Sequence, residues 1–194
     1  MQVFETRYIK MMNDCLDSDS RFGVVLIKEG KEVGGPSIPR SVGTVAKITS
    51  INQLTNNRLL VNSIGTQRFT ILEIMTDDPY MVARVNIEHE QVYEEIENQV
   101  ILEATQSTTE YLQALLSLQE GWVKSPVSSI PEESVDLSFF MAQLIQQPVP
   151  EQQKILEIDS VVGRLLSCTS FMNSENKKIM AKTKMELTLK FSRN

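Results

Sequence analysis

Hydrophobic and polar positions follow different patterns in the two halves of this chain of 194 residues. In the first half, runs rich in Val, Ile, Leu, Thr and Phe alternate with short polar or glycine-containing segments, which is typical of β-strands joined by turns. The predicted strands are residues 22–28, 42–54, 58–64, 66–75 and 80–87. Asn56-Asn57 and Asp77-Asp78-Pro79 are typical of turns between consecutive strands. This succession predicts an antiparallel, barrel-like sheet.

Apolar residues recur at helical spacing in one segment before the first strand and throughout the second half. The early segment contains Phe4, Tyr8, Met11, Met12, Cys15 and Leu16 at intervals that indicate a helix. Residues 90–119 have the spacing of a long amphipathic helix. Further helices are predicted from residue 132 to residue 147, from residue 151 to just before Asn173, and after Ser174, which is a suitable N-cap.

Together these patterns predict an α+β fold with two parts. Residues 1–89 form an antiparallel β-barrel or sheet subdomain, and residues 90–194 form an α-helical bundle subdomain. The segment from Gly34 to Pro39 is predicted to be a surface loop between strands, where binding contacts are often found.

Composition places the chain among ordinary globular proteins, with 41% hydrophobic and 23% charged residues. No run approaches the length of about eighteen apolar residues that a membrane helix needs, so we expect no membrane insertion. Cys15 and Cys168 lie far apart in apolar segments, which favours buried free thiols and a reducing, cytoplasmic location.

The net charge of −6 argues against nucleic acid as a partner, because phosphate binding needs a surplus of Lys and Arg. Basic residues gather only in the C-terminal segment 177–193. That segment is interpreted as a solvated helix or a connection, with an anionic partner as the alternative.

Catalytic signatures are missing from the sequence. No G-x-x-x-x-G-K-[ST] phosphate-binding loop is present, and His89 is the only histidine. A two-histidine zinc site is therefore excluded, and no catalytic residues, cofactor or metal site are predicted. The acidic pairs Asp77-Asp78, Glu94-Glu95 and Glu132-Glu133 are interpreted as solvated charges, because adjacent residues of a helix point in different directions.

Short motifs in a fixed order extend over nearly the whole chain. They are Val3-Phe4-Glu5 with Arg7-Tyr8, Phe22-Gly23-Val24-Val25, Val42-Gly43-Thr44, Gly65-Thr66-Gln67-Arg68-Phe69, Pro79-Tyr80-Met81-Val82-Ala83, residues 151–157, and Arg164-Leu165-Leu166. In this arrangement the chain resembles the substrate-recognition domain at the N-terminus of Lon ATP-dependent proteases. The resemblance implies a PUA-like sheet followed by a helix bundle. The chain is too short to contain the ATPase and protease modules as well.

The sequence departs from the family pattern in two places. Family members usually carry a further segment before the motif that starts at Val3, so the sheet is expected to lack the family's first strand. Gln152 stands where the family often has Lys, so a role for that charge is not carried over.

The resemblance implies a stand-alone, non-catalytic module that binds exposed apolar segments of unfolded or partly folded polypeptides. The candidate binding or structural residues are Arg7, Tyr8, Met11, Met12, Arg68, Phe69, Tyr80 and Met81. The two Arg–aromatic pairs are expected to anchor the first helix to the sheet through backbone carbonyls, with ligand contact as the alternative. The methionines either fill the core or form an adaptable binding surface.

Three other functions stay open at this stage, of which the weakest is a hydrolase that uses a pair of carboxylates. PUA-like sheets elsewhere bind RNA, although Arg58, Arg68 and Arg84 are isolated in this one. The long helix of residues 90–119 is also suited to an adaptor that docks on a separate ATP-dependent protease or self-associates. Salt dependence of binding separates the RNA alternative from apolar polypeptide binding.

Overall fold

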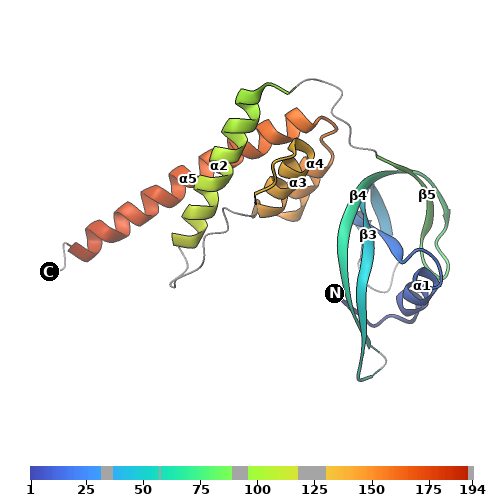
Figure 1. Ribbon diagram of the computed structural model, residues 1–194. Helices are drawn as coiled ribbons and strands as arrows, with labels where there is room; N and C mark the ends of the chain where they lie inside the picture. Colours follow the sequence, from blue (N-terminus) through green and yellow to red (C-terminus); the bar gives the residue numbers. More distant parts are fainter. Residues whose placement is uncertain (32–36, 57, 89–95, 118–129, 192–194) are drawn as a thin grey trace. The chain divides into compact units, whose positions relative to one another are not determined.

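The computed structural model describes residues 1–31, 37–56, 58–88, 96–117 and 130–191, and for residues 182–191 it describes the backbone alone. The chain forms two compact units, residues 1–89 and 90–194 (Figure 1). The first contains a sheet and one helix, and the second contains helices. This is the α+β class expected from the sequence.

The first unit is an antiparallel sheet with a helix near one end. Its elements are β1 (Gln2–Val3), α1 (Thr6–Leu16), β2 (Arg21–Gly30), β3 (Ser37–Leu54), β4 (Arg58–Thr76) and β5 (Val82–Ile87). The strand order is β1-β4-β3-β2, and β5 also pairs with β4. Figure 1 shows β3 and β4 as long curved strands and places α1 beside the turn between β4 and β5. Strand β4 therefore connects most of the sheet.

Two predicted strands, residues 58–64 and 66–75, form the single strand β4 in the structure. The prediction of a turn near Gly65 was wrong. The register instead shifts between Val45 and Ala46, which pair with Gln67 and Gly65 and leave Thr66 as an extra residue. Thr66 Oγ1 donates a hydrogen bond to the Val45 carbonyl at 3.1 Å. Gly65 thus accompanies a β-bulge, which bends a strand without reversing it.

The N-terminal residues form a short strand that the sequence pattern did not predict. Gln2 and Val3 pair with Leu60 and Leu59 of β4. The Met1 ammonium donates to the Val61 carbonyl at 2.7 Å, and the Val61 amide donates to the Met1 carbonyl at 2.9 Å. The chain therefore enters helix α1 from a position fixed on β4.

Helix α1 covers one cluster of the core. The buried residues of this cluster are Val3, Met12, Ile48 and Val61, with Tyr8, Ile9, Met11, Cys15, Phe22, Ile51 and Leu59 packed against them. Burial of such apolar surface is the main stabilising contribution to a unit of this kind. The helix predicted from apolar spacing is confirmed, and its apolar face is the one that packs on the sheet.

Phe69 occupies space that two glycines leave open. It is buried, with an exposed fraction of 3%. A Cβ atom at Gly43 would lie 2.7 Å from Phe69 Cζ and 2.6 Å from the Val24 carbonyl oxygen, and one at Gly23 would lie 3.0 Å from Phe69 Cζ. A side chain at position 43 would collide with both the ring and the neighbouring backbone.

The second unit contains α2 (Asn98–Ser117), α3 (Ser134–Leu144), α4 (Val149–Leu156) and α5 (Val161–Phe191). Its buried apolar core comprises Ala104, Tyr111, Leu137, Met141, Ile145, Val161, Leu165, Cys168 and Met172. Among the described residues, none of these helices is both long enough and apolar enough to cross a membrane.

The helix predicted from residue 151 to just before Asn173 is interrupted in the structure. Helix α4 ends at Leu156 and α5 begins at Val161, because Ser160 caps the new helix through the Gly163 amide, which donates to Ser160 Oγ at 3.1 Å. The predicted break before Ser174 was also wrong. Asn173 accepts a hydrogen bond from Ser107 Oγ of α2 at 2.9 Å, and α5 continues through Ser174.

The second unit also buries the Arg164 side chain completely. Arg164 Nε donates to Ser138 Oγ at 3.0 Å, and Nη1 donates to the Ile158 carbonyl at 2.8 Å. The guanidinium also lies 4.1 Å from the centre of the Phe139 ring. These contacts join α5, α3 and the segment before α5, because a buried guanidinium must have hydrogen-bond partners.

Replacing Gly43 by Ala should lower the free energy of unfolding by about 1–3 kcal/mol, the usual cost of overpacking. Chemical denaturation measures the change. Gly65→Ala is the matched control in the same sheet, because a Cβ atom there meets only the Thr44 methyl group, at 3.0 Å. An equal effect of the two substitutions would contradict the tight packing of Phe69 against Gly43.

Burial of Cys168 predicts alkaline destabilisation of the helical unit. Burial raises the pKa of the Cys168 thiol from 9.0 to about 11. The unfolded state then ionises first, so the stabilising contribution is complete below pH 9 and is lost as the pH rises toward 11. Between about pH 8 and about pH 10, the free energy of unfolding of the Cys168→Ala variant should fall by about 1 kcal/mol less than that of the unchanged protein. Urea denaturation followed by circular dichroism measures it, and identical pH profiles of the two proteins would refute it.

Candidate functional site

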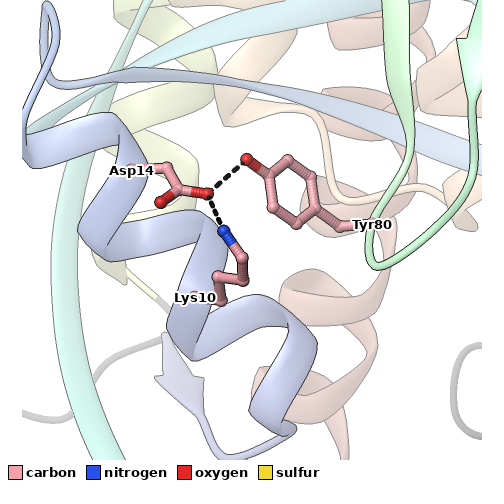
Figure 2. A network of polar contacts seen from close by, with 3 residues as sticks. All are labelled: Lys10, Asp14 and Tyr80. Carbon is pink, nitrogen blue, oxygen red and sulfur yellow. Dashed lines mark hydrogen bonds and ion pairs between the residues drawn. The ribbon is translucent and has the colours of Figure 1, made fainter.

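A polar network connects α1 with the turn between β4 and β5. Asp14 Oδ2 accepts hydrogen bonds from Lys10 Nζ at 2.9 Å and from Tyr80 Oη at 2.7 Å. Figure 2 shows the Tyr80 ring reaching from the hairpin to the carboxylate on α1. The hydrogen bond from Lys10, and next that from Tyr80, lower the pKa of Asp14, and the bond to Asp14 raises the pKa of Tyr80. Asp14 therefore stays ionised at neutral pH and holds the hairpin turn against α1.

Exposed apolar side chains gather on this hairpin. We call them the hairpin surface: Leu72, Ile74 and Met75 of β4 and Val82 of β5. Their exposed fractions are 60%, 45%, 68% and 40%, respectively. Small domains normally bury most large apolar side chains, so neighbouring exposed ones indicate an interaction surface.

Two irregularities in the ladder account for the most exposed of these side chains. Between the pairs Ile71–Val85 and Glu73–Arg84, β4 has the extra residue Leu72. Between Ile74–Ala83 and Thr76–Val82, it has the extra residue Met75. A bulge re-aims the extra side chain, which explains the exposure of Leu72 and Met75. Ile74 pairs with Ala83 and therefore lies on the opposite face of the hairpin from Val82.

Two charges of the hairpin, those of Glu73 and Arg84, neutralise each other, whereas Asp77 and Asp78 of its turn are exposed. Glu73 Oε2 and Arg84 Nη2 lie 2.7 Å apart across β4 and β5, and both side chains are largely exposed. An exposed pair of this kind contributes little to stability.

Three of the residues predicted as binding or anchoring positions are buried. The exposed fractions are 1% for Met12, 5% for Arg68 and 3% for Phe69. Met12 and Phe69 belong to the packing of the first unit, and the Arg68 carbonyl accepts a hydrogen bond from the Glu88 amide at 2.8 Å. A macromolecular ligand cannot reach these side chains in the folded unit.

The other predicted residues are partly exposed. Arg7 Nε donates to Glu5 Oε2 at 3.0 Å, and the guanidinium lies 4.5 Å from the centre of the Tyr8 ring. Glu5 lies two residues before Arg7 and Tyr8 directly follows it, so these contacts of Arg7 are local to the start of α1. Met11, Tyr80 and Met81 are half-buried. Of the predicted set, Tyr80 and Met81 are those nearest in sequence to the hairpin surface.

Sequence reasoning missed the four residues of the hairpin surface, which it assigned to ordinary strands. One signal was available: Ile71-Leu72 and Ile74-Met75 are adjacent apolar pairs, whereas a half-buried strand alternates apolar and polar residues. The doubled positions coincide with the two register shifts.

Other candidate chemistry is not assembled in the part of the chain that the structure describes. These residues include no group of three or more His, Cys, Asp or Glu side chains that could hold a metal ion. Asp77, Asp78, Glu132 and Glu133 are exposed. His89, Glu94, Glu95 and residues 34–36 of the predicted loop lie outside the described residues, as do the side chains of Lys182, Lys184 and Lys190. Residues 37–39, which were predicted to belong to that loop, are part of β3.

Comparison with known proteins agrees with this architecture. Residues 1–174 match the family model of the ATP-dependent protease La (LON) substrate-binding domain. The chain is 24% identical over 180 residues to a Lon protease of Syntrophus aciditrophicus, covering 90% of this chain and 23% of that protein. It is also 24% identical over 190 residues to a Lon protease of Flavobacterium johnsoniae, covering 94% and 23%. The chain thus spans about a quarter of the length of these curated relatives.

Two solved structures support the fold. A Lon N-terminal domain protein from Xanthomonas campestris has a TM-score of 0.65 at 23% identity, covering 89% of this chain and 88% of that one. The N-terminal domain of a Mycobacterium avium complex Lon protease has a TM-score of 0.60 at 15% identity, covering 89% and 90%. With the family match over most of its length, the chain belongs to the Lon substrate-binding domain family.

Proposed function

We propose that this protein is a non-catalytic polypeptide-binding module whose hairpin surface receives exposed apolar segments of client proteins. The observation that carries the proposal is the exposure of Leu72, Ile74, Met75 and Val82 on one hairpin of a substrate-binding domain. Unfolded and partly folded chains expose apolar side chains that native proteins bury, so a surface of this chemistry selects for them.

The residue types of the surface favour clients of varied sequence. Met75 is unbranched and adaptable, so it can fit side chains of different shapes. Complete burial of one Leu or Met contributes about 1.5–3 kcal/mol before the costs of association. A surface with these few apolar side chains is therefore suited to weak, reversible binding of many clients.

The fixed position of the hairpin supports this use. The Tyr80–Asp14 hydrogen bond of 2.7 Å joins the turn to α1, and α1 packs on the core through Met12. A binding surface held in this way loses less conformational entropy when a client binds.

The relatives named Lon proteases support a role that delivers bound clients to ATP-dependent proteolysis. The sequence contains no phosphate-binding loop, so recognition by these residues is proposed without cleavage. Both cysteines are free thiols, which supports a reducing compartment such as the cytoplasm.

Replacing Leu72 and Met75 together by Ser should weaken binding to a labelled, permanently unfolded polypeptide by about tenfold or more, because two apolar contacts are lost. Fluorescence anisotropy measures the affinity. Ile64→Ser is the matched control, since Ile64 is also on β4, is 58% exposed, and pairs with Lys47 rather than with β5. Equal affinities of the double variant and the control would contradict the proposed surface.

Binding of the same polypeptide should change little between low and high salt, because the proposed contacts of Leu72, Met75 and Val82 are apolar. The titration is repeated with single-stranded RNA as a competitor. Strong weakening of binding by salt, together with displacement of the polypeptide by RNA, would support the nucleic-acid alternative and contradict the proposed binding of apolar segments.

A further inference from the structure

We infer that the client binds as an added β-strand along the free edge of β5, in addition to its apolar contacts with the hairpin surface. The inference rests on the proposed function and specifies how that site holds a polypeptide. Among the described strands, β5 pairs with β4 alone, so its other edge is open to strand addition.

The backbone direction identifies the groups at this edge. The Glu88 amide, one residue beyond β5, donates to the Arg68 carbonyl of β4 at 2.8 Å. Backbone groups of an antiparallel strand point alternately toward its two neighbours. Asn86 and Arg84 therefore face β4, whereas Ala83, Val85 and Ile87 direct their N–H and C=O groups to the open edge. An extended polypeptide supplies the complementary row of donors and acceptors.

The edge of β5 is regular, because both register shifts of this ladder place the extra residue on β4. The six residues of β5 pair in unbroken succession, and their exposure alternates from Val82 to Ile87. Its only charged residue, Arg84, is already paired with Glu73. Proteins usually guard an edge with charges, bulges or Pro; β5 has no Pro, carries no extra residue in its ladder, and has a single charge that is paired within the hairpin.

Of the other outer strands, β1 has only two residues, and β2 provides the contrast. Its ladder with β3 has two register shifts, between Val25 and Ile27 and between Ile27 and Glu29. It also carries the exposed charged residues Arg21, Lys28 and Glu29. These features discourage strand addition, so β5 is the edge that the sheet leaves available.

The neighbouring side chains specify an apolar occupant. One face of the added strand would lie beside Val82, next to the exposed Leu72 and Met75 of the same hairpin. Its other face would lie on the side of Ala83, Val85 and Ile87, which are half-buried. The occupant is therefore an extended segment with apolar side chains. The edge can accept segments of many different sequences, because main-chain hydrogen bonds supply part of the affinity.

The first test uses three versions of one labelled peptide that alternates Val and Thr and has Lys at each end. One version is unmodified, the second is N-methylated at the Val amides, and the third at the Thr amides. Strand addition uses the amides of one alternating set only. One methylated peptide should bind at least about tenfold more weakly than the unmodified peptide, and the other should bind nearly as well.

If both methylated peptides bind like the unmodified one, or both are weakened alike, strand addition is overturned. In the first case, binding that still depends on Leu72 and Met75 would leave the proposed function intact. Absence of binding by the unmodified peptide and by the unfolded polypeptide would overturn both proposals together.

The second test changes the protein. Val85→Pro removes an N–H at the open edge and leaves the groups that face β4 in place, a position that a sheet tolerates. The variant should keep its circular dichroism spectrum and lose at least about tenfold in affinity for the unmodified peptide. Retained affinity in a folded variant would contradict the inference. If the variant does not fold, the titrations with the methylated peptides decide whether the client adds as a strand.

Discussion

Hydrogen bonding along β4 is the constraint on which the first unit depends. Strands β1, β3 and β5 all pair with this strand, so any change in its path moves several neighbours together. Near Gly65 it bends through a bulge and turns toward the buried Phe69, whose ring occupies the space above Gly43 and Gly23. Beyond Phe69, two further irregularities expose Leu72 and Met75. The same strand thus forms part of the core and then presents a surface.

The helical unit satisfies a different constraint, the burial of a charge. Arg164 has no exposed surface, and its hydrogen bonds to Ser138 and to the Ile158 carbonyl join three parts of the unit. Because loss of the bond to the Ile158 carbonyl would leave part of the buried guanidinium without a hydrogen-bond partner, the segment between α4 and α5 is held in its path. The interruption at residues 157–160 is therefore part of the packing, and α5 follows it without a further break.

The proposed recognition and the stability of the unit place opposite demands on the hairpin. Exposed apolar side chains and an unpaired strand edge are features that a domain specialised only for stability would avoid. The hydrogen bond between Tyr80 and Asp14 fixes the hairpin turn on α1, and the Glu73–Arg84 pair joins β4 and β5. These contacts keep the hairpin in place while its apolar groups remain accessible.

The sequence by itself determined the fold class, the helix α1 and most strands, because apolar spacing reports which side of an element faces a core. It also carried the motifs of the family. It misjudged Gly65 and Ser174, since a glycine can serve a bulge as well as a turn, and a serine caps a helix only where the chain enters one. The candidate site was decided by tertiary structure alone. Exposure of Leu72 and Met75 depends on the register between β4 and β5, and Met12 and Phe69 are buried by contacts with distant segments, which local sequence does not encode.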